Sequence, residues 1–151
     1  MKPIAFILIL ILFAGTREIK TDDLYHKILM AESGYNDNAE SHRGAIGRWQ
    51  ITTAGLDHFN TFNKYRAHYT TNDIKIPNIN DSVGRWIIET LIKEWDGSII
   101  HAVNSYNMGS ANTMRGKFYD AYCYKILGVE YTKWRREKKA YKKIGGVYYL
   151  K

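Results

Sequence analysis

The chain has 151 residues, of which 45% are hydrophobic and 25% charged, and its formal net charge is +7. A chain of this length forms one domain of ordinary size, and its composition excludes a disordered or fibrous protein. Its single cysteine, Cys123, excludes an internal disulfide framework. We expect a plain buried thiol there rather than a nucleophile, because Cys123 lies between two tyrosines in a helix-like run.

Residues 1–16 carry a signal of their own. Lys2 precedes an apolar run of 11 residues from Ile4 to Ala14, which matches the hydrophobic part of a signal peptide and is short for a membrane span. We predict that this segment directs export and that the domain occupies residues 17–151. The run lacks the small residue that a good cleavage site needs three places earlier, so an uncleaved N-terminal anchor is the alternative to a removed signal peptide.

The first helix of the domain is predicted over residues 24–33, with an N-cap and two acids just before it and Gly34 directly after it. Leu24 and Ile28 precede Glu32 at intervals of four, so the three side chains share one helix face. We therefore expect the Glu32 carboxyl to be partly desolvated. Desolvation disfavours the charged form, which suits a general acid that works near neutral pH.

The sequence pattern from residue 34 to residue 127 predicts a loop followed by four helices. Residues 34–50 are rich in Gly, Asn and Asp, which predicts irregular backbone or a short hairpin wrapped around Glu32. The helices are expected over residues 53–65, from Asn80 or Asp81 to Trp95, over 99–107 and over 118–127. The second of these carries apolar residues every four positions and is predicted to be the central packing helix. No strand pattern is long enough to build a sheet, so the predicted fold class is mainly α.

The positive charge is concentrated at the C-terminal end. Residues 115–151 contain eleven Lys or Arg and three acids, whereas the remainder of the chain has a net charge of −1. Aromatic residues at 131, 134 and 141 interrupt the cations, a pattern typical of a surface helix with one packed stripe. We predict a basic C-terminal helix over about residues 115–151. Its charge is explained either by a solvated helix face or by attraction to an anionic polymer or membrane surface.

Two ordered blocks of sequence resemble the motifs of a known family. The first, from Met30 to Ile51, contains Glu-Ser-Gly, Gly-Ala-Ile-Gly and Gln-Ile, and the second, from Asn104 to Gly109, reads Asn-Ser-Tyr-Asn-Met-Gly. Between them, residues 77–84 are similar to the entry into the family's middle helix. Over residues 22–112 the chain resembles the soluble, Slt-like lytic transglycosylases with an SLT domain. That resemblance implies a lysozyme-like helical domain with a small irregular or hairpin lobe at the active-site loop.

The resemblance also implies an activity. It predicts a peptidoglycan lytic transglycosylase that cleaves the β-1,4 bond between N-acetylmuramic acid and N-acetylglucosamine and needs no cofactor or metal. Glu32 would act twice, first protonating the glycosidic oxygen and then taking a proton from the sugar's 6-hydroxyl, which closes a 1,6-anhydro ring. Hydrolases instead place two carboxylates about 5–9.5 Å apart across the bond. The nearby candidates for such a second carboxylate are Asp37, Glu40 and Asp57.

Substrate contacts follow from the first motif block. Ser41 corresponds to a family serine that holds the substrate's acetamido group, and a turn-forming serine is the alternative. Gln50 corresponds to a glutamine that hydrogen-bonds sugar, with a satisfied core amide as the alternative. Arg48 and Trp49 stand where the family often carries Leu-Met. We expect Trp49 to stack on a sugar face and Arg48 to meet an acidic peptide stem.

The second motif block contributes Tyr106 and Asn107. By resemblance, the Tyr106 hydroxyl approaches Glu32, and the Asn107 amide orients the sugar ring or the acid. Without the motif, an aromatic residue on a buried helix would be assigned to the core.

Two rival functions are compatible with the same residues. One is a peptidoglycan or chitin hydrolase related to goose-type lysozyme, and the other is a non-catalytic glycan-binding component of a secretion or phage-entry apparatus. The expected partners are glycan strands, a secretion, conjugation or phage-entry complex, and a membrane surface contacted by either end of the chain; nucleic acid is not expected. The expected location is exported, periplasmic or membrane-anchored facing the cell wall, with a virion-associated protein as the alternative.

Overall fold

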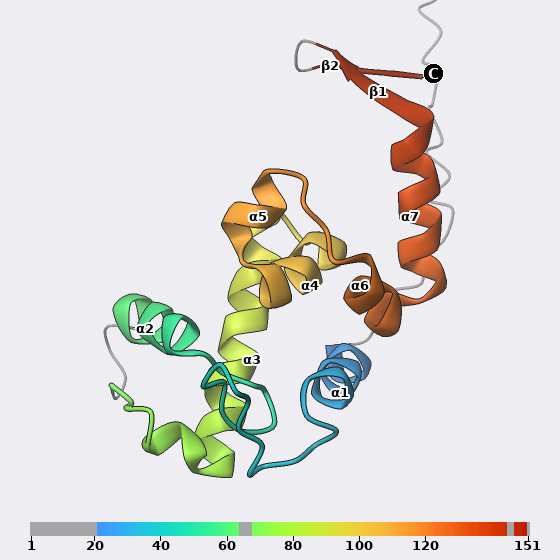
Figure 1. The fold of residues 1–151 in the computed structure, drawn as a ribbon. Helices are drawn as coiled ribbons and strands as arrows, with labels where there is room; N and C mark the ends of the chain where they lie inside the picture. Colours follow the sequence, from blue (N-terminus) through green and yellow to red (C-terminus); the bar gives the residue numbers. More distant parts are fainter. Residues whose placement is uncertain (1–20, 64–67, 145–146, 151) are drawn as a thin grey trace, which may run out of the picture.

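The computed structural model describes residues 21–63, 68–144 and 147–150 (Figure 1). Over these residues the chain forms seven α-helices, one short 3-10 helix and one β-hairpin. In chain order the elements are α1 (Thr21–Glu32), α2 (Thr53–Phe62), η1 (Asp73–Lys75), α3 (Pro77–Glu94), α4 (Ile99–Met108), α5 (Ser110–Met114), α6 (Asp120–Leu127), α7 (Val129–Ala140), β1 (Tyr141–Ile144) and β2 (Val147–Leu150). The predicted mainly helical fold is confirmed.

Helix α3 is the centre of the helical body, as its apolar pattern predicted. In Figure 1 it runs through the middle of the molecule, with α1 on one side and α2 on the other. Its inner face is fully enclosed, since Val83 and Ile88 have no exposed surface. The helix begins at Pro77, three residues before the predicted start, because the fixed φ of proline suits the first helical position.

The ends of the shorter helices follow their glycines. Helix α1 ends at Glu32, just before Gly34. Helix α4 ends at Met108, and the amide of the next residue, Gly109, donates to the Ser105 carbonyl at 2.8 Å. Helix α2 ends at Phe62, three residues before the end that we predicted. Glycine therefore predicted these helix ends well. The polar stretch after α2 contains no glycine to mark where that helix ends.

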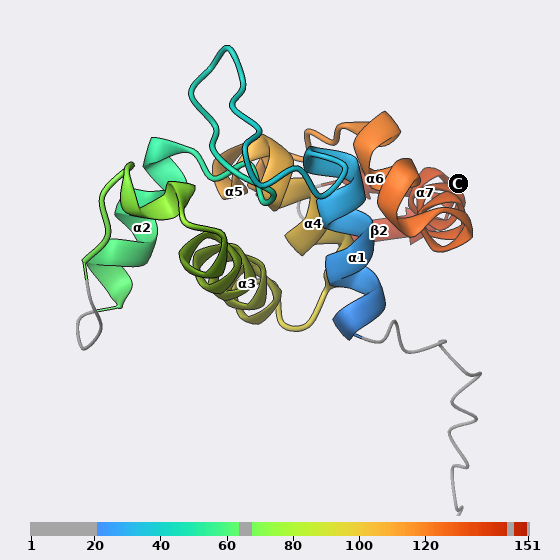
Figure 2. The ribbon, with the colours of Figure 1, turned by 90° about the horizontal axis from the view of Figure 1, so that it is seen from below.

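The loop from residue 34 to residue 50 forms the expected irregular lobe. It contains no extended strand, and its regular pairing consists of isolated bridges between Glu40 and Ile46 and between Ile46 and Ile51. Figure 2 shows the loop projecting from the helices on the side where α1 ends. Because the loop turns back on itself, Ser33 at its start and Arg48 near its end both lie close to the end of α1.

The basic C-terminal region is not one helix, so that prediction is wrong. It folds into α6, α7 and a hairpin in which Tyr141 pairs with Leu150 and Ile144 with Val147. Gly128, with φ of +54°, separates α6 from α7, and the aromatic and β-branched residues after α7 favour strands over helix. Part of the predicted aromatic stripe does anchor α7, because Tyr131 is 3% exposed and the ring of Trp134 lies 4.8 Å from that of Phe118 between centroids.

The N-terminal segment 1–16, with its predicted export signal, lies outside the described residues. Among the helices that the structure does describe, none is both long and apolar enough to cross a membrane.

Candidate active site

Glu32 is the last residue of α1, and its carboxylate accepts a hydrogen bond from the hydroxyl of Tyr122 on α6. The side chain is partly buried, and this burial raises the pKa of the Glu32 carboxyl above its ordinary value. Two groups on α6 oppose the rise, because the Tyr122 hydroxyl and the positive charge of Lys125 lower the pKa of Glu32. The site therefore holds one sheltered acid whose proton affinity is balanced between burial and two stabilising partners.

Tyr106 of α4 lies on the same side of the core as Glu32. Burial raises the pKa of the Tyr106 hydroxyl well above its usual value, and the negative charge of Glu32 raises it further. The Tyr106 hydroxyl donates to the backbone carbonyl of Trp49 at 2.7 Å. This bond joins residues 57 positions apart in sequence, so the two motif blocks meet at Tyr106, whose hydroxyl is within reach of the Glu32 charge.

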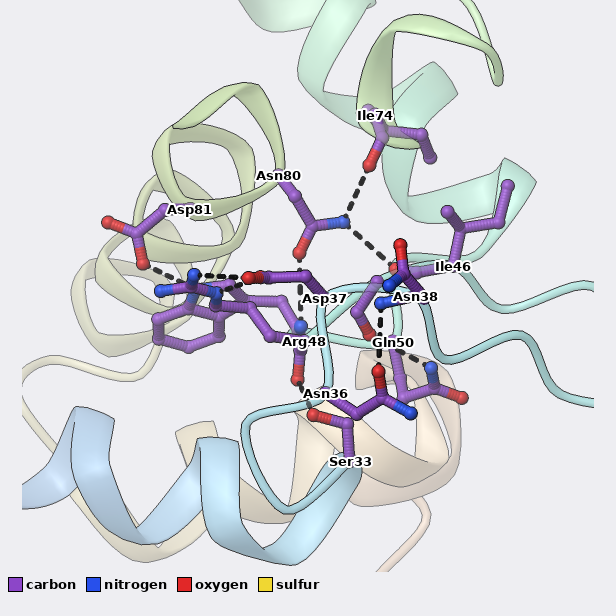
Figure 3. A network of polar contacts seen from close by, with 12 residues as sticks. Ser33, Asn36, Asp37, Asn38, Ile46, Arg48, Gln50, Ile74, Asn80 and Asp81 are labelled. Atoms are coloured by element: carbon purple, nitrogen blue, oxygen red, sulfur yellow. Dashed lines mark hydrogen bonds and ion pairs between the residues drawn. The ribbon is translucent and has the colours of Figure 1, made fainter. Parts of the chain in front are cut away.

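A network of polar contacts fixes the first motif loop against the end of α1 (Figure 3). The Ser33 hydroxyl donates to the Arg48 carbonyl at 2.8 Å. The Arg48 guanidinium binds the Asp37 carboxylate through two bonds, of 2.5 and 2.9 Å. This paired geometry occupies both carboxylate oxygens and holds the pKa of Asp37 below its usual range. Arg48 is thus paired within its own loop, and its contact with a peptide stem stays a prediction.

Asn80, in the first turn of α3, ties that helix to the loop. Its side chain is 1% exposed, and its amide nitrogen donates to the carbonyls of Ile46 and Ile74 at 2.9 Å each. Its amide oxygen accepts the backbone N–H of Trp49 at 3.1 Å (Figure 3). A buried amide with all these bonds made both orders and stabilises the segments around it.

Trp49 corrects one of our expectations. Its indole has no exposed surface and packs edge-on against Tyr25, with ring centroids 5.7 Å apart. The indole N–H donates to Asp81 at 2.9 Å, and the ring lies so close to Gly84 that a Cβ there would be 2.2 Å from it. A fully enclosed ring offers no face to a sugar, so Trp49 is a core residue and its predicted stacking role is wrong.

The other predicted substrate residues serve the loop in different ways. The Ser41 hydroxyl accepts the backbone N–H groups of Arg43 and Ala45, at 3.3 and 3.0 Å, which is the turn-forming arrangement. The Gln50 side-chain amide donates to the Gly47 carbonyl at 2.9 Å, and the Gln50 backbone has a left-handed φ of +48°. Asn107 is exposed at the end of α4. The sugar contacts of Ser41, Gln50 and Asn107 stay predictions.

The polar residues of the second motif block lie mostly inside the core. Asn104 has no exposed surface, and its amide donates to the Thr113 hydroxyl at 2.7 Å and to the Lys117 carbonyl at 2.9 Å. The Asn104 oxygen accepts the backbone N–H of Tyr119 at 3.0 Å. These bonds hold the segment that leads into α6, and they thereby position Tyr122 against Glu32.

Tyr122 and Lys125 are the site residues that sequence reasoning missed. Both lie on α6 three positions apart, and helix geometry places such residues on one face. A signal was present, because Tyr122 falls in the apolar stripe of a predicted helix, and a buried tyrosine hydroxyl needs a partner. The sequence did not show that this partner lies 90 residues earlier. Cys123, as expected, is a buried thiol, and burial raises its pKa to about 12.

Three causes shift the pKa of Glu32, namely burial, the Tyr122 hydroxyl and the Lys125 charge, and none of them is a carboxylate. Of the acids considered as a second catalytic group, Asp37 is paired with Arg48, and Glu40 and Asp57 are exposed. Within the described residues, no cluster of three or more His, Cys, Asp or Glu side chains could hold a metal ion.

Comparison with known proteins identifies the family. Residues 10–122 match the model of the transglycosylase SLT domain, a stretch that includes both motif blocks and ends at Tyr122. No curated protein sequence matches the chain.

Two solved structures share the fold. One is the crystal structure of the 70 kDa soluble lytic transglycosylase Slt70 from Escherichia coli, with 17% identity and a TM-score of 0.58 over 74% of this chain and 19% of the other. The second is an inactive glutamate-to-glutamine mutant of the lytic transglycosylase Slt from Pseudomonas aeruginosa, with 15% identity and a TM-score of 0.61 over 85% of this chain and 24% of the other. The chain thus spans less than a quarter of the length of either protein, and the likeness shows the lysozyme-like SLT fold.

Proposed function

Because this chain belongs to the transglycosylase SLT domain family, we propose that it is a peptidoglycan lytic transglycosylase with Glu32 as its catalytic acid and base. Its proposed substrate is the β-1,4 bond between N-acetylmuramic acid and N-acetylglucosamine, and its product carries a 1,6-anhydro end. The family match supports the proposed substrate class, and the surroundings of Glu32 support the proposed acid and base chemistry.

The reaction needs one carboxyl group in both protonation states. In the first step protonated Glu32 delivers its proton to the glycosidic oxygen as the bond from that oxygen to the sugar's anomeric carbon breaks. In the second step the Glu32 carboxylate takes the proton of the 6-hydroxyl while that oxygen bonds to the anomeric carbon. No water is consumed. Burial favours the protonated form needed first, and the Tyr122 hydroxyl stabilises the carboxylate needed second.

The single observation that favours this reaction over hydrolysis is the state of the three acids considered as a second catalytic group: Asp37 is bound to Arg48, and Glu40 and Asp57 are exposed. A glycosidase with two carboxylates places the second one about 5–9.5 Å from the first, across the bond that is cleaved. The groups that shift the pKa of Glu32 are Tyr122 and Lys125, and neither is a carboxylate. The inactivity of the glutamate-to-glutamine mutant of the Pseudomonas enzyme agrees with a mechanism that depends on one glutamate.

Digestion of purified cell-wall sacculi tests this proposal. We expect the wild-type protein to release soluble fragments and Glu32→Gln to lose at least about a hundredfold in rate, because a general acid contributes about 10²–10⁴-fold. Asp57→Asn is the matched control, since it removes an exposed carboxyl on α2, and we expect it to retain full activity. Retained activity in Glu32→Gln would contradict the proposal. Loss of activity in Asp57→Asn would favour a two-carboxylate hydrolase.

The cellular setting is part of the same proposal. A substrate in the cell wall requires the enzyme to reach it, and the apolar segment of residues 4–14 has the composition of an export signal. We propose local opening of the wall during secretion, conjugation or phage entry as its role, because an export segment next to an SLT domain would bring the enzyme to the wall.

A further inference from the structure

The end of α1 lacks a cation of its own and receives one from α6. The C-terminal end of a helix carries a partial negative charge, equivalent to about half an elementary charge. Helix α1 has no basic residue in its last turn, and Glu32 adds a carboxylate at that end. The Lys125 ammonium donates to the Ala31 carbonyl at 3.2 Å, directly before Glu32.

Tyr122 and Lys125 therefore both contact the C-terminal end of α1 from one face of α6. Tyr122 binds the Glu32 carboxylate, and Lys125 binds the carbonyl of the preceding residue. Their spacing of three places them together on α6. The tyrosine contributes a hydroxyl dipole, whereas the lysine contributes a full positive charge beside a carboxylate that must form during the reaction.

We propose that Lys125 is a positioning residue of the reaction, which offsets the negative end of α1 and stabilises the Glu32 carboxylate left after proton delivery, and so sets the pH range in which Glu32 acts as an acid. This inference rests on the proposed function. A general acid loses activity as pH rises through its pKa. The Lys125 charge lowers the pKa of Glu32, so its removal moves the alkaline limb of the activity profile to higher pH.

Among the described residues, Lys125 is the cation whose charge shifts the pKa of Glu32. From α6, Tyr122 donates a hydrogen bond and Lys125 contributes its charge. From α4, the neutral Tyr106 hydroxyl senses the Glu32 charge and donates to Trp49. On the loop, the Arg48 charge is paired with Asp37.

The test is the pH profile of sacculus digestion by Lys125→Met. We expect the ratio of variant to wild-type rates to be about two- to fivefold larger near pH 8 than near pH 5, the size that an exposed charge pair supports. Lys125→Arg keeps the charge and should follow the wild-type profile. Lys93→Met is the matched control, because Lys93 is exposed in the last turn of α3, and it should also follow the wild type.

A role limited to holding the helix end would lower stability or rate equally at every pH, and a Lys125→Met profile parallel to that of the wild type would overturn the proposal. A shifted profile for Lys125→Arg would overturn it as well. If Lys125→Met fails to fold, Lys125→Gln replaces it, and failure of both to fold would show a structural role only. Carbon-13 NMR titration of the Glu32 carboxyl gives a readout without catalysis, and we expect a higher midpoint in the variant.

The same set of proteins separates the two proposals. Full activity in Glu32→Gln would remove the proposed function, while the NMR titration would still report the effect of Lys125. Conversely, an inactive Glu32→Gln together with an unshifted Lys125→Met would leave the proposed function intact and overturn this inference alone.

Discussion

Replacing Gly84 by alanine tests how the motif loop is seated on the central helix. In an ordinary helix interior, glycine to alanine stabilises by about 0.5–1 kcal/mol, because alanine loses less conformational freedom on folding. Gly84 lies within α3 and is buried. A Cβ on it would stand 2.2 Å from Cγ and 2.3 Å from Cδ2 of Trp49. We therefore expect the usual sign of this substitution to reverse.

The ring of Trp49 has little freedom to move away. Its side chain has no exposed surface, its indole N–H is bonded to Asp81, and its backbone N–H is bonded to Asn80. Overpacking of a closed core costs about 1–3 kcal/mol and sometimes more. Separations this short place Gly84→Ala at the upper end, so after the gain in helix propensity we expect a net loss of about 2 kcal/mol. For a chain of this size that corresponds to a melting temperature lower by about 4–8 °C.

Thermal unfolding followed by circular dichroism measures the effect, with Gly55→Ala as the matched control. Gly55 also lies in a helix, α2, but a Cβ on it would come no closer than 3.3 Å to another atom, the end of the half-buried Ile87 side chain. The next contacts are the Thr52 hydroxyl at 3.5 Å and the Ile51 side chain at 3.9 Å. Since the end of the Ile87 side chain can shift, we expect Gly55→Ala to leave the melting temperature unchanged or slightly raised. A melting temperature for Gly84→Ala equal to or above that of the wild type would refute the packing argument.

Two further predictions concern the acid itself. Tyr122→Phe removes a hydrogen bond to a charged group, a contact that contributes about 1.5–3 kcal/mol, so we expect digestion of sacculi near neutral pH to slow by about ten- to a hundredfold, and an unchanged rate would remove Tyr122 from the site. Glu32→Gln should raise the melting temperature near pH 8 and lose this advantage toward pH 4, because burial raises the pKa of Glu32 in the folded state. The folded protein then binds the proton more tightly than the unfolded chain, so stability falls as pH rises from the unfolded to the folded pKa. A difference in melting temperature that stays constant with pH would contradict this linkage.

The sequence was most informative where local pattern determines structure. The spacing of Leu24, Ile28 and Glu32 predicted a sheltered acid, and the structure places Glu32 partly buried at the end of α1. The glycines after α1 and α4 predicted where those helices stop. These features depend on helix periodicity and on the conformational range of glycine, both of which can be seen in a few consecutive residues.

The errors arose where contacts join distant parts of the chain. We assigned Trp49 to the substrate side because the motif gives its position in the sequence but does not show that its side chain is buried. The slot that encloses it is formed by Gly84, 35 positions later. A glycine inside an otherwise helical pattern was a signal from which such close packing could have been predicted. Tyr122 was missed for the same reason, because a helix face alone does not name the element that it packs against.

The C-terminal region shows a different limit. Composition predicted a basic helix, and helix α7 is basic, but charge does not determine where a helix stops. The change from helix to hairpin at Tyr141 depends on aromatic and β-branched residues pairing between β1 and β2, and strand preference of this kind depends strongly on context.

The most direct test of the central claim is digestion of sacculi in water enriched in heavy oxygen, followed by mass measurement of the fragments. If Glu32 acts alone, first as acid and then as base toward the sugar's own hydroxyl, every new glycan end will be lighter than a hydrolysed end by one water and will carry no oxygen from the solvent. New ends that contain the heavy isotope would contradict this account and would assign the protein to the hydrolases.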